Sequence, residues 1–201
     1  MRKLALLSTS LMALASLAAA SPMLAQTNTG TAGSPWSVAW SGPTSGSGTA
    51  VNVTNPPGAW ANTSPTSFWI STNSSASLPD GTGDNANRYG YTWTNIFTSA
   101  TGGPIQATVW TDNFFNSFTI NGVTTTLASA PSPGDFNQPQ ARIFTIDSHS
   151  GTNTLTFNTT GDGQTDALNA SFTSTPEPSS MALLGTGLIG LVPMIRRRRK
   201  A

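Results

Sequence analysis

Three oxygen-bearing side chains stand at alternate positions of one glycine-containing segment: Asp80, Thr82 and Asp84. Calcium takes about six to eight oxygen ligands, and a loop with glycine can wrap around the ion. The segment lacks the terminal glutamate of an EF-hand, so that motif is excluded. Ordinary solvated turns explain it most simply, and a structural calcium is the alternative. No other cofactor is indicated.

A second candidate chemistry is carbohydrate binding, because exposed aromatic faces stack on sugar rings while Asp and Asn bind hydroxyls. Three tryptophans in predicted strands are expected in the core: Trp69, Trp93 and Trp110. Three in Pro- and Gly-rich surroundings are expected to be exposed: Trp36, Trp40 and Trp60. Trp60, Asp112 and Asn113 are therefore candidate ligand-binding residues, although a turn-capping role for the Asp-Asn pair is favoured.

Enzymatic chemistry has little support in the sequence. His149 is the single histidine, the chain has no cysteine, and residues 26–174 contain no glutamate. A serine hydrolase with His149 as its base is an alternative, but no Gly-x-Ser-x-Gly motif accompanies this histidine. We expect no catalytic residue and no enzymatic activity.

The charge distribution separates the two ends from the middle of the chain. Only Arg88 and Arg142 are basic between residues 26 and 175, against seven aspartates, which gives a net charge near −5. The whole chain has a net charge of +1 because its other basic residues lie at the two ends. A mildly acidic domain with two cations lacks the basic surface of a nucleic-acid-binding protein.

The middle of the chain is rich in Thr, Ser, Asn and Gly, a composition that favours strands and tight turns. Asn121-Gly122 between two alternating runs predicts a hairpin with Phe118, Ile120, Val123 and Leu127 on one face. Further strands are expected at 37–40, 50–54, 67–71, 89–97, 105–111, 141–146, 154–158 and 167–173. Because these strands are short and divided by turn residues, we predict an all-β, two-sheet sandwich.

The order of these segments is similar to that of galactose-binding-like jelly-roll domains. The match rests on Asp112-Asn113, on the hairpin at Asn121-Gly122, and on the Gly-x-Asn-x-Leu-x-Phe run at 151–157. The resemblance implies a jelly-roll core over residues 67–174, preceded by a Ser/Thr/Gly/Pro-rich part over 26–66. It also implies that carbohydrate binding is an alternative role.

The N-terminus has the layout of a secretory signal peptide. Arg2 and Lys3 precede an apolar run at 4–17, which small residues follow. Cleavage after Ala25 is preferred to cleavage after Ala20, so we assign residues 1–25 to the signal peptide.

The C-terminus combines three features at residues 175–201. These are Pro176-Glu177-Pro178, an apolar run at 181–195, and the basic cluster Arg196, Arg197, Arg198, Arg199 and Lys200. The basic cluster is expected to stay in the cytoplasm and to set the topology of a short transmembrane helix. As a helix the run is about 22 Å long, against a hydrocarbon core of about 30 Å. A transient anchor is therefore favoured over a permanent one.

This tail resembles the PEP-CTERM signal recognised by exosortase-type membrane proteases of bacteria that produce exopolysaccharide. The resemblance implies export through the inner membrane, transient anchoring, cleavage of the tail, and delivery to the cell surface or the extracellular space. We therefore predict a structural or adhesive protein of the matrix or biofilm, with exopolysaccharide as a candidate partner. A carbohydrate-binding module is the main alternative, and an extracellular hydrolase is the less favoured one.

Overall fold

The computed structural model describes residues 27–31, 35–60, 66–77, 79, 89–127, 141–161 and 164–174. Within these ranges every regular element is a β-strand and every strand pairing is antiparallel, which confirms the all-β prediction. None of the described residues forms a helix that could span a bilayer. The predicted signal peptide, the calcium segment at 80–84 and the tail from residue 175 onward lie outside the described residues.

Nine strands form one continuous hydrogen-bonded sheet. The strands are β1 (Trp36–Ser41), β2 (Ser45–Thr49), β3 (Val51–Asn52), β4 (Ile70–Ser71), β5 (Gly90–Asp112), β6 (Phe114–Ile120), β7 (Val123–Thr126), β8 (Arg142–Thr160) and β9 (Ala167–Ser174). Their order is β3-β4-β9-β5-β8-β6-β7. Outside this order, β1 pairs with β5 on one side and with β2 on the other.

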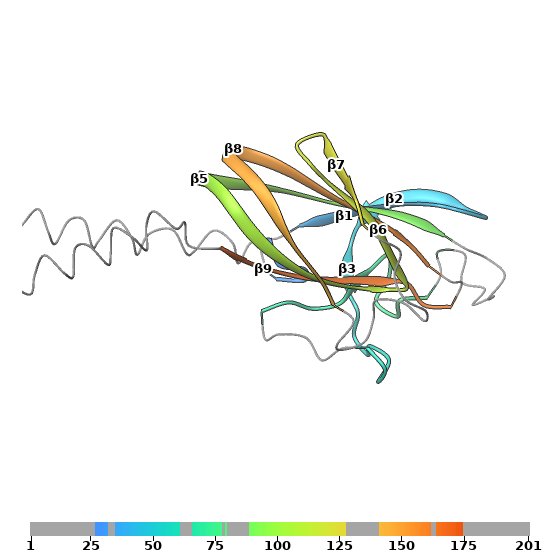
Figure 1. Ribbon diagram of the computed structural model, residues 1–201. Helices are drawn as coiled ribbons and strands as arrows, with labels where there is room; N and C mark the ends of the chain where they lie inside the picture. Colours follow the sequence, from blue (N-terminus) through green and yellow to red (C-terminus); the bar gives the residue numbers. More distant parts are fainter. Residues whose placement is uncertain are drawn as a thin grey trace, which may run out of the picture.

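The two longest strands, β5 and β8, pair along both of their halves and turn back together at one end (Figure 1). The pairing register shifts between Ser99 and Gly102 at this bend. Gly102 has a φ of 76°, and a Cβ added there would lie 2.8 Å from the backbone nitrogen of Ser150. The bend therefore needs glycine at this position, both for its backbone conformation and for the close approach of β8.

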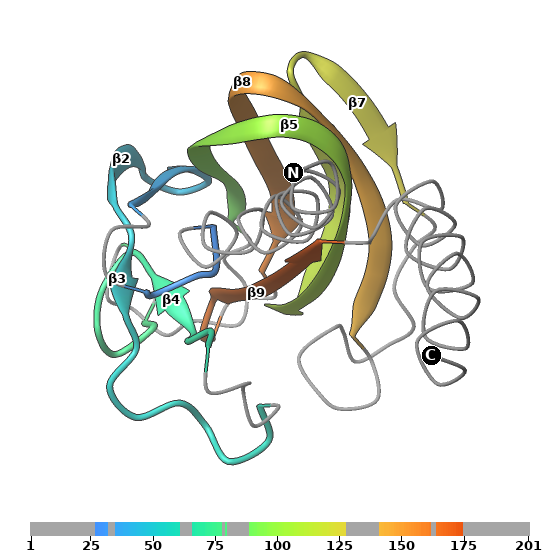
Figure 2. The same cartoon turned by 90° about the vertical axis from the view of Figure 1, so that its left-hand side faces the viewer.

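The bend divides the sheet into two layers. We call the first the β1 layer: residues 90–99 of β5 pair with β1 and with residues 151–160 of β8, and β2, β6 and β7 extend this layer. In the second, the β9 layer, residues 105–112 of β5 pair with β9, which leads on to β4 and β3. Figure 1 shows β1 and β2 above and β9 below, and Figure 2 shows β9 under the arch of β5.

Aromatic side chains from both layers pack between them. The Trp36 ring of the β1 layer lies 6.3 Å from the Phe172 ring of β9, measured between centroids. The Phe118 ring of β6 stacks on Phe144, which belongs to the other layer, at 4.5 Å. Trp93 and Phe157 are completely buried beside them. These contacts make the interior of a two-layer sandwich, stabilised by the burial of large apolar surfaces.

Most predicted strands occur near their predicted positions, with specific differences. The turn at Asn121 and Gly122 has the expected positive φ values of 50° and 85°. Phe118 and Ile120 are buried as predicted, and Val123 lies on their face as predicted because it pairs with Ile120, although it is 67% exposed. The reason is that β7 is an edge strand with all four residues exposed.

Two other differences concern strand number and burial. The strands expected at 89–97 and 105–111 are one bent strand, β5, and those expected at 141–146 and 154–158 are likewise one strand, β8. The strand β2, with the sequence Ser-Gly-Ser-Gly-Thr, was not predicted because it contains no apolar residue. Trp36 is 2% exposed, which contradicts the expectation that it is exposed.

Candidate binding site

The predicted ligand-binding residues Trp60 and Asp112 do lie together, but inside the protein. The indole Nε1 of Trp60 donates a hydrogen bond of 2.8 Å to Oδ2 of Asp112. Trp60 is 6% exposed, so the expectation that it is exposed is wrong, and Asp112 and Asn113 are buried as well. The Trp60 ring packs on Trp69 at 4.3 Å between centroids.

This arrangement makes Trp60 and Asp112 part of a second, smaller core. The hydroxyl of Thr165 donates a hydrogen bond of 2.9 Å to the same oxygen of Asp112. Apolar residues surround the pair: Val53, Trp69, Ala76, Trp110 and Ala167. A buried carboxylate needs such donors, because burial without them is costly. The contacts therefore fasten the loop at residues 53–60 to the end of β5, and ligand binding by these residues stays a prediction.

A second buried carboxylate, Asp166, is held in a similar way. The hydroxyl of Tyr91 donates a hydrogen bond of 2.7 Å to its Oδ2, and the hydroxyl of Ser71 donates one of 2.5 Å to its backbone oxygen. Gly161 lies so close that a Cβ added there would overlap the carboxyl group. No group of three or more acidic, His or Cys side chains that could hold a metal occurs among the described residues.

His149, the base of the hydrolase alternative, lies in the bend of β8 and is exposed. Its Nδ1 lies 2.9 Å from the backbone oxygen of Ser150. The hydroxyls of the two flanking serines donate to backbone oxygens of β5: Ser148 to Gly103 and Ser150 to Ala100. The hydrogen bonds at this site thus hold the bend together.

The outer face of the β1 layer carries two rows of small polar side chains that run across six strands. Cross-strand partners in the first row are Thr49, Ser37, Thr94, Thr156, Thr119 and Thr124. Cross-strand partners in the second row are Ser47, Ala39, Thr92, Asn158, Ser117 and Thr126. We call this surface the ladder face. Its residues alternate along the strands with buried ones such as Trp93 and Phe157, which is why they point outward.

Side-chain hydrogen bonds link neighbouring members of these rows. Thr92 donates to Oδ1 of Asn158 at 3.2 Å, and Nδ2 of Asn158 donates to the hydroxyl of Ser117 at 3.1 Å. The hydroxyls of Thr119 and Thr124 lie 2.8 Å apart. These bonds fix the orientation of the polar groups before any ligand arrives.

The ladder face carries no charged residue among those that the structure describes. The described charged residues belong to other segments: Asp112, Arg142, Asp147 and Asp166. Arg142 and Asp147 lie in the half of β8 that belongs to the β9 layer, and Asp112 and Asp166 are buried. The two rows are therefore uncharged and carry hydroxyl or amide groups except at Ala39, and the exposed Ile96 lies beside the first row on the same face.

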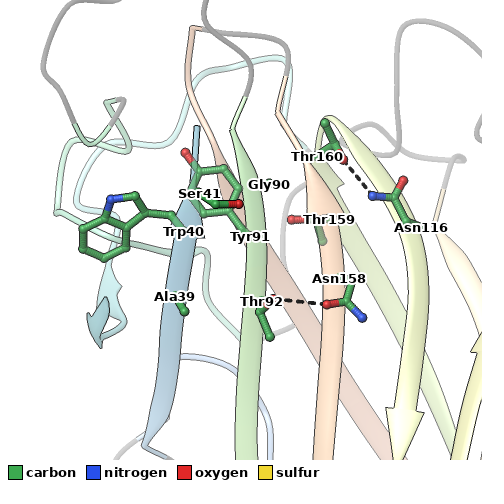
Figure 3. A pocket seen from close by; sticks show the side chains of 10 residues that line it. All are labelled: Ala39, Trp40, Ser41, Gly90, Tyr91, Thr92, Asn116, Asn158, Thr159 and Thr160. Carbon is green, nitrogen blue, oxygen red and sulfur yellow. Dashed lines mark hydrogen bonds between the residues drawn. The ribbon is translucent and has the colours of Figure 1, made fainter. Parts of the chain in front are cut away.

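Two hollows of about 380 and 430 Å³ lie on this face and share Ala39 and Thr92 in their linings. Figure 3 shows the first, with Thr92, Asn116, Asn158 and Thr160 around it. Nδ2 of Asn116 donates to the hydroxyl of Thr160 at 2.7 Å. Ala39 has only a methyl group, so the second row of larger side chains is interrupted there, and Gly90, two residues before Thr92, has no side chain.

These residues can bind a neutral ligand through several hydrogen bonds, since each hydroxyl or amide can donate and accept. Sequence reasoning missed this face. The signal was present in the alternation of polar residues, as in Thr92-x-Thr94 and Thr154-x-Thr156-x-Asn158. Within a single strand, this alternation indicates only that the strand has a polar face. The sequence of one strand does not show which residues of other strands will lie beside it.

Comparison with known protein families adds information about the tail. Residues 174–200 match the family model of the PEP-CTERM protein-sorting motif. The chain carries this sorting motif. It confirms the resemblance of the tail. The motif implies that the protein is exported, sorted by an exosortase and transiently anchored in the membrane before it reaches the surface or the extracellular space.

The comparisons with curated proteins and with solved structures add little about the function of the protein. No curated protein matches the sequence. Similar solved structures include a beta-glucosidase from Kluyveromyces marxianus in complex with glucose, 8% identical with a TM-score of 0.42 over 78% of this chain and 19% of that chain. A GH31 alpha-xylosidase from Xanthomonas citri is 14% identical, with a TM-score of 0.38 over 72% of this chain and 14% of that chain. The PA14 domain of the antifreeze protein MpAFP is 14% identical, with a TM-score of 0.29 over 45% of this chain and 46% of that chain.

The chain thus spans less than a fifth of either enzyme. All three TM-scores are too low for these likenesses to carry an argument about fold or function.

Proposed function

We propose that this PEP-CTERM protein is a non-enzymatic structural or adhesive component of the cell surface or extracellular matrix. An exosortase cleaves its tail, and the β-sandwich then acts outside the cell, in a matrix or biofilm that contains exopolysaccharide. The observation that carries the proposal is the sorting motif at residues 174–200. The signal-peptide layout of residues 1–25 and the jelly-roll-type sandwich expected for the passenger fit the same role.

The composition of the passenger also supports a matrix role. Its described surface is dominated by hydroxyl and amide groups with few charges, which suits a protein that stays hydrated among polysaccharide chains. Without cysteine, no disulfide contributes to its stability, which depends on packing and hydrogen bonds unless a metal also contributes.

Fractionation with mass spectrometry of the mature termini tests the proposal. The mature protein is expected at the surface or in the medium, beginning near Gln26 and lacking the basic cluster at 196–200. In a strain without the exosortase, the tail is expected to remain and the protein to stay with the inner membrane. Full-length protein in the cytosol, with Met1 and Ala201 both present, contradicts the proposal.

A carbohydrate-binding module is the second candidate function. The ladder face favours it, because preoriented neutral hydrogen-bonding groups line two hollows. Retention of the exported protein by a glycan distinguishes this role from a purely structural one.

A further inference from the structure

We infer that the ladder face binds a neutral, extended polysaccharide chain lying across the strands of the β1 layer. The inference deepens the carbohydrate-binding alternative and rests on it, but it does not depend on the sorting route. The site differs from the one that the sequence suggested at Trp60 and Asp112, where both side chains are buried and bonded to each other.

The absence of charge on the described part of this face selects the class of ligand. A polyanion gains its affinity mainly from basic side chains, and the only described arginine, Arg142, lies in the other layer. A hydrophobic partner needs an apolar patch, whereas both rows consist of hydroxyl and amide residues apart from Ala39. A polymer of neutral sugars presents the complementary hydroxyl groups at every residue.

The geometry of the rows suits a repeating ligand. Neighbouring strands lie about 4.8 Å apart, and the two rows are about 6.6 Å apart because they are two residues apart along each strand. Each row therefore offers a hydrogen-bonding group at a regular spacing across six strands. The side chains are already oriented by bonds such as Thr92 to Asn158 and Asn158 to Ser117, which lowers the entropic cost of binding.

The hollows indicate where the chain is held most closely. They share Ala39 and Thr92, so the small side chain of Ala39 lies where the two depressions adjoin. A sugar can approach the sheet there and reach Thr92, Asn116 and Asn158. Each single contact is weak, and affinity comes from the repetition of contacts along the polymer.

The test is affinity electrophoresis of the exported protein through gels containing galactomannan, xyloglucan or alginate. If the protein is not exported, the full chain is purified in detergent and tested in the same gels. Binding can therefore be measured whether or not the export proposal holds, and a failure of export is distinguished from a failure of binding. We expect retardation by at least one of the two neutral polysaccharides and none by the anionic alginate.

Two variants address the face directly. The triple substitution Thr94→Val, Thr156→Val and Thr119→Val removes three hydroxyls of the first row but keeps β-branched side chains suited to strands. Ala39→Ile places a larger apolar side chain where the two hollows adjoin, without removing any hydrogen bond. We expect the triple variant to weaken binding by about tenfold or more because it loses three groups that hydrogen-bond the ligand. We expect a similar loss for Ala39→Ile because its larger side chain keeps the polysaccharide away from the sheet.

Matched controls lie on the outer face of the β9 layer. Thr108, Thr145 and Thr173 stand on neighbouring strands there, and the triple change of these residues to Val removes the same number of hydroxyls. Thr145→Ile places an isoleucine at an exposed position of this face, as Ala39→Ile does on the ladder face. Both controls are expected to bind like the wild type, and thermal unfolding verifies that all variants are folded.

The inference is overturned by a lack of retardation by either neutral polysaccharide, by stronger retardation by alginate, or by equal loss of binding in the ladder-face and control variants. Unchanged binding in both ladder-face variants also overturns it, because the polysaccharide then binds elsewhere.

Discussion

The indole nitrogen of Trp60 donates its hydrogen bond to Asp112, a residue 52 positions later in the chain. Trp60→Phe removes this donor and leaves the buried carboxylate with fewer hydrogen bonds. We expect the free energy of unfolding to fall by about 2–4 kcal/mol, from the lost bond and the smaller ring. Denaturant titration measures this. Trp40→Phe, at a half-buried position, is the control and should cost clearly less; equal losses would refute the assignment.

Tyr91 and Asp166 offer a cleaner test of a buried hydrogen bond. Tyr91→Phe removes only the hydroxyl that donates to Asp166 Oδ2 at 2.7 Å. The expected loss is about 1–3 kcal/mol, because the acceptor is a buried carboxylate. In the control, Tyr89→Phe, the lost hydroxyl lies 3.1 Å from that of Thr44, a neutral and partly exposed partner. Thermal unfolding should rank Tyr91→Phe as the more destabilising change, and the reverse order contradicts the role given to Asp166.

Gly161 has no room for a side chain, because an added Cβ would overlap the Asp166 carboxyl group. Gly161→Ala is therefore expected to lower the free energy of unfolding by about 1–3 kcal/mol through overpacking. Gly48→Ala is the matched change, since nothing lies within 4 Å of a Cβ built there. It should leave stability nearly unchanged in a thermal melt. If both variants melt like the wild type, the close approach of Gly161 to Asp166 is not present in solution.

Asn153 is completely buried and connects the bend of β8 with the β6–β7 hairpin. Its Nδ2 donates to the backbone oxygen of His149, and its Oδ1 accepts bonds from the backbone nitrogen of His149 and from Asn121. Asn153→Ala removes all of these hydrogen bonds from a buried position, so we expect a loss of about 2–4 kcal/mol. Hydrogen exchange should show faster exchange at His149 and at Thr154, the partner of Asn121.

The control for this change is Asn116→Ala, which removes one exposed amide bonded to Thr160. It should cost less than about 1 kcal/mol. A similar loss at both positions would mean that Asn153 does not organise the bend.

How much the sequence predicts depends on how local the determining contacts are. The hairpin at Asn121-Gly122 was predictable because the turn is set by two adjacent residues, and the sorting motif was predictable because it is contiguous. The burial of Trp60 could not be predicted from the sequence, because its hydrogen-bond partner Asp112 lies at the end of β5, far away in the chain. The ladder face was missed for the same reason: Thr94, Thr156 and Thr119 align only through the register of three strands.

The strand β2 shows a further limit. Its Ser-Gly-Ser-Gly-Thr sequence has little strand propensity, and its pairing with β1 keeps it extended. Tertiary context decided the structure there.

The shared strands β5 and β8 have a consequence for how this protein comes apart and forms. Neither layer can unfold by itself, because β5 and β8 each continue from one layer into the other. Unfolding is therefore expected to be a single cooperative transition. Residues 90–112 must also find residues 142–160 across a long intervening segment, and such distant pairing makes acquisition of the native state slow. A chain that folds slowly stays extended for longer after synthesis, which leaves time for its passage across a membrane.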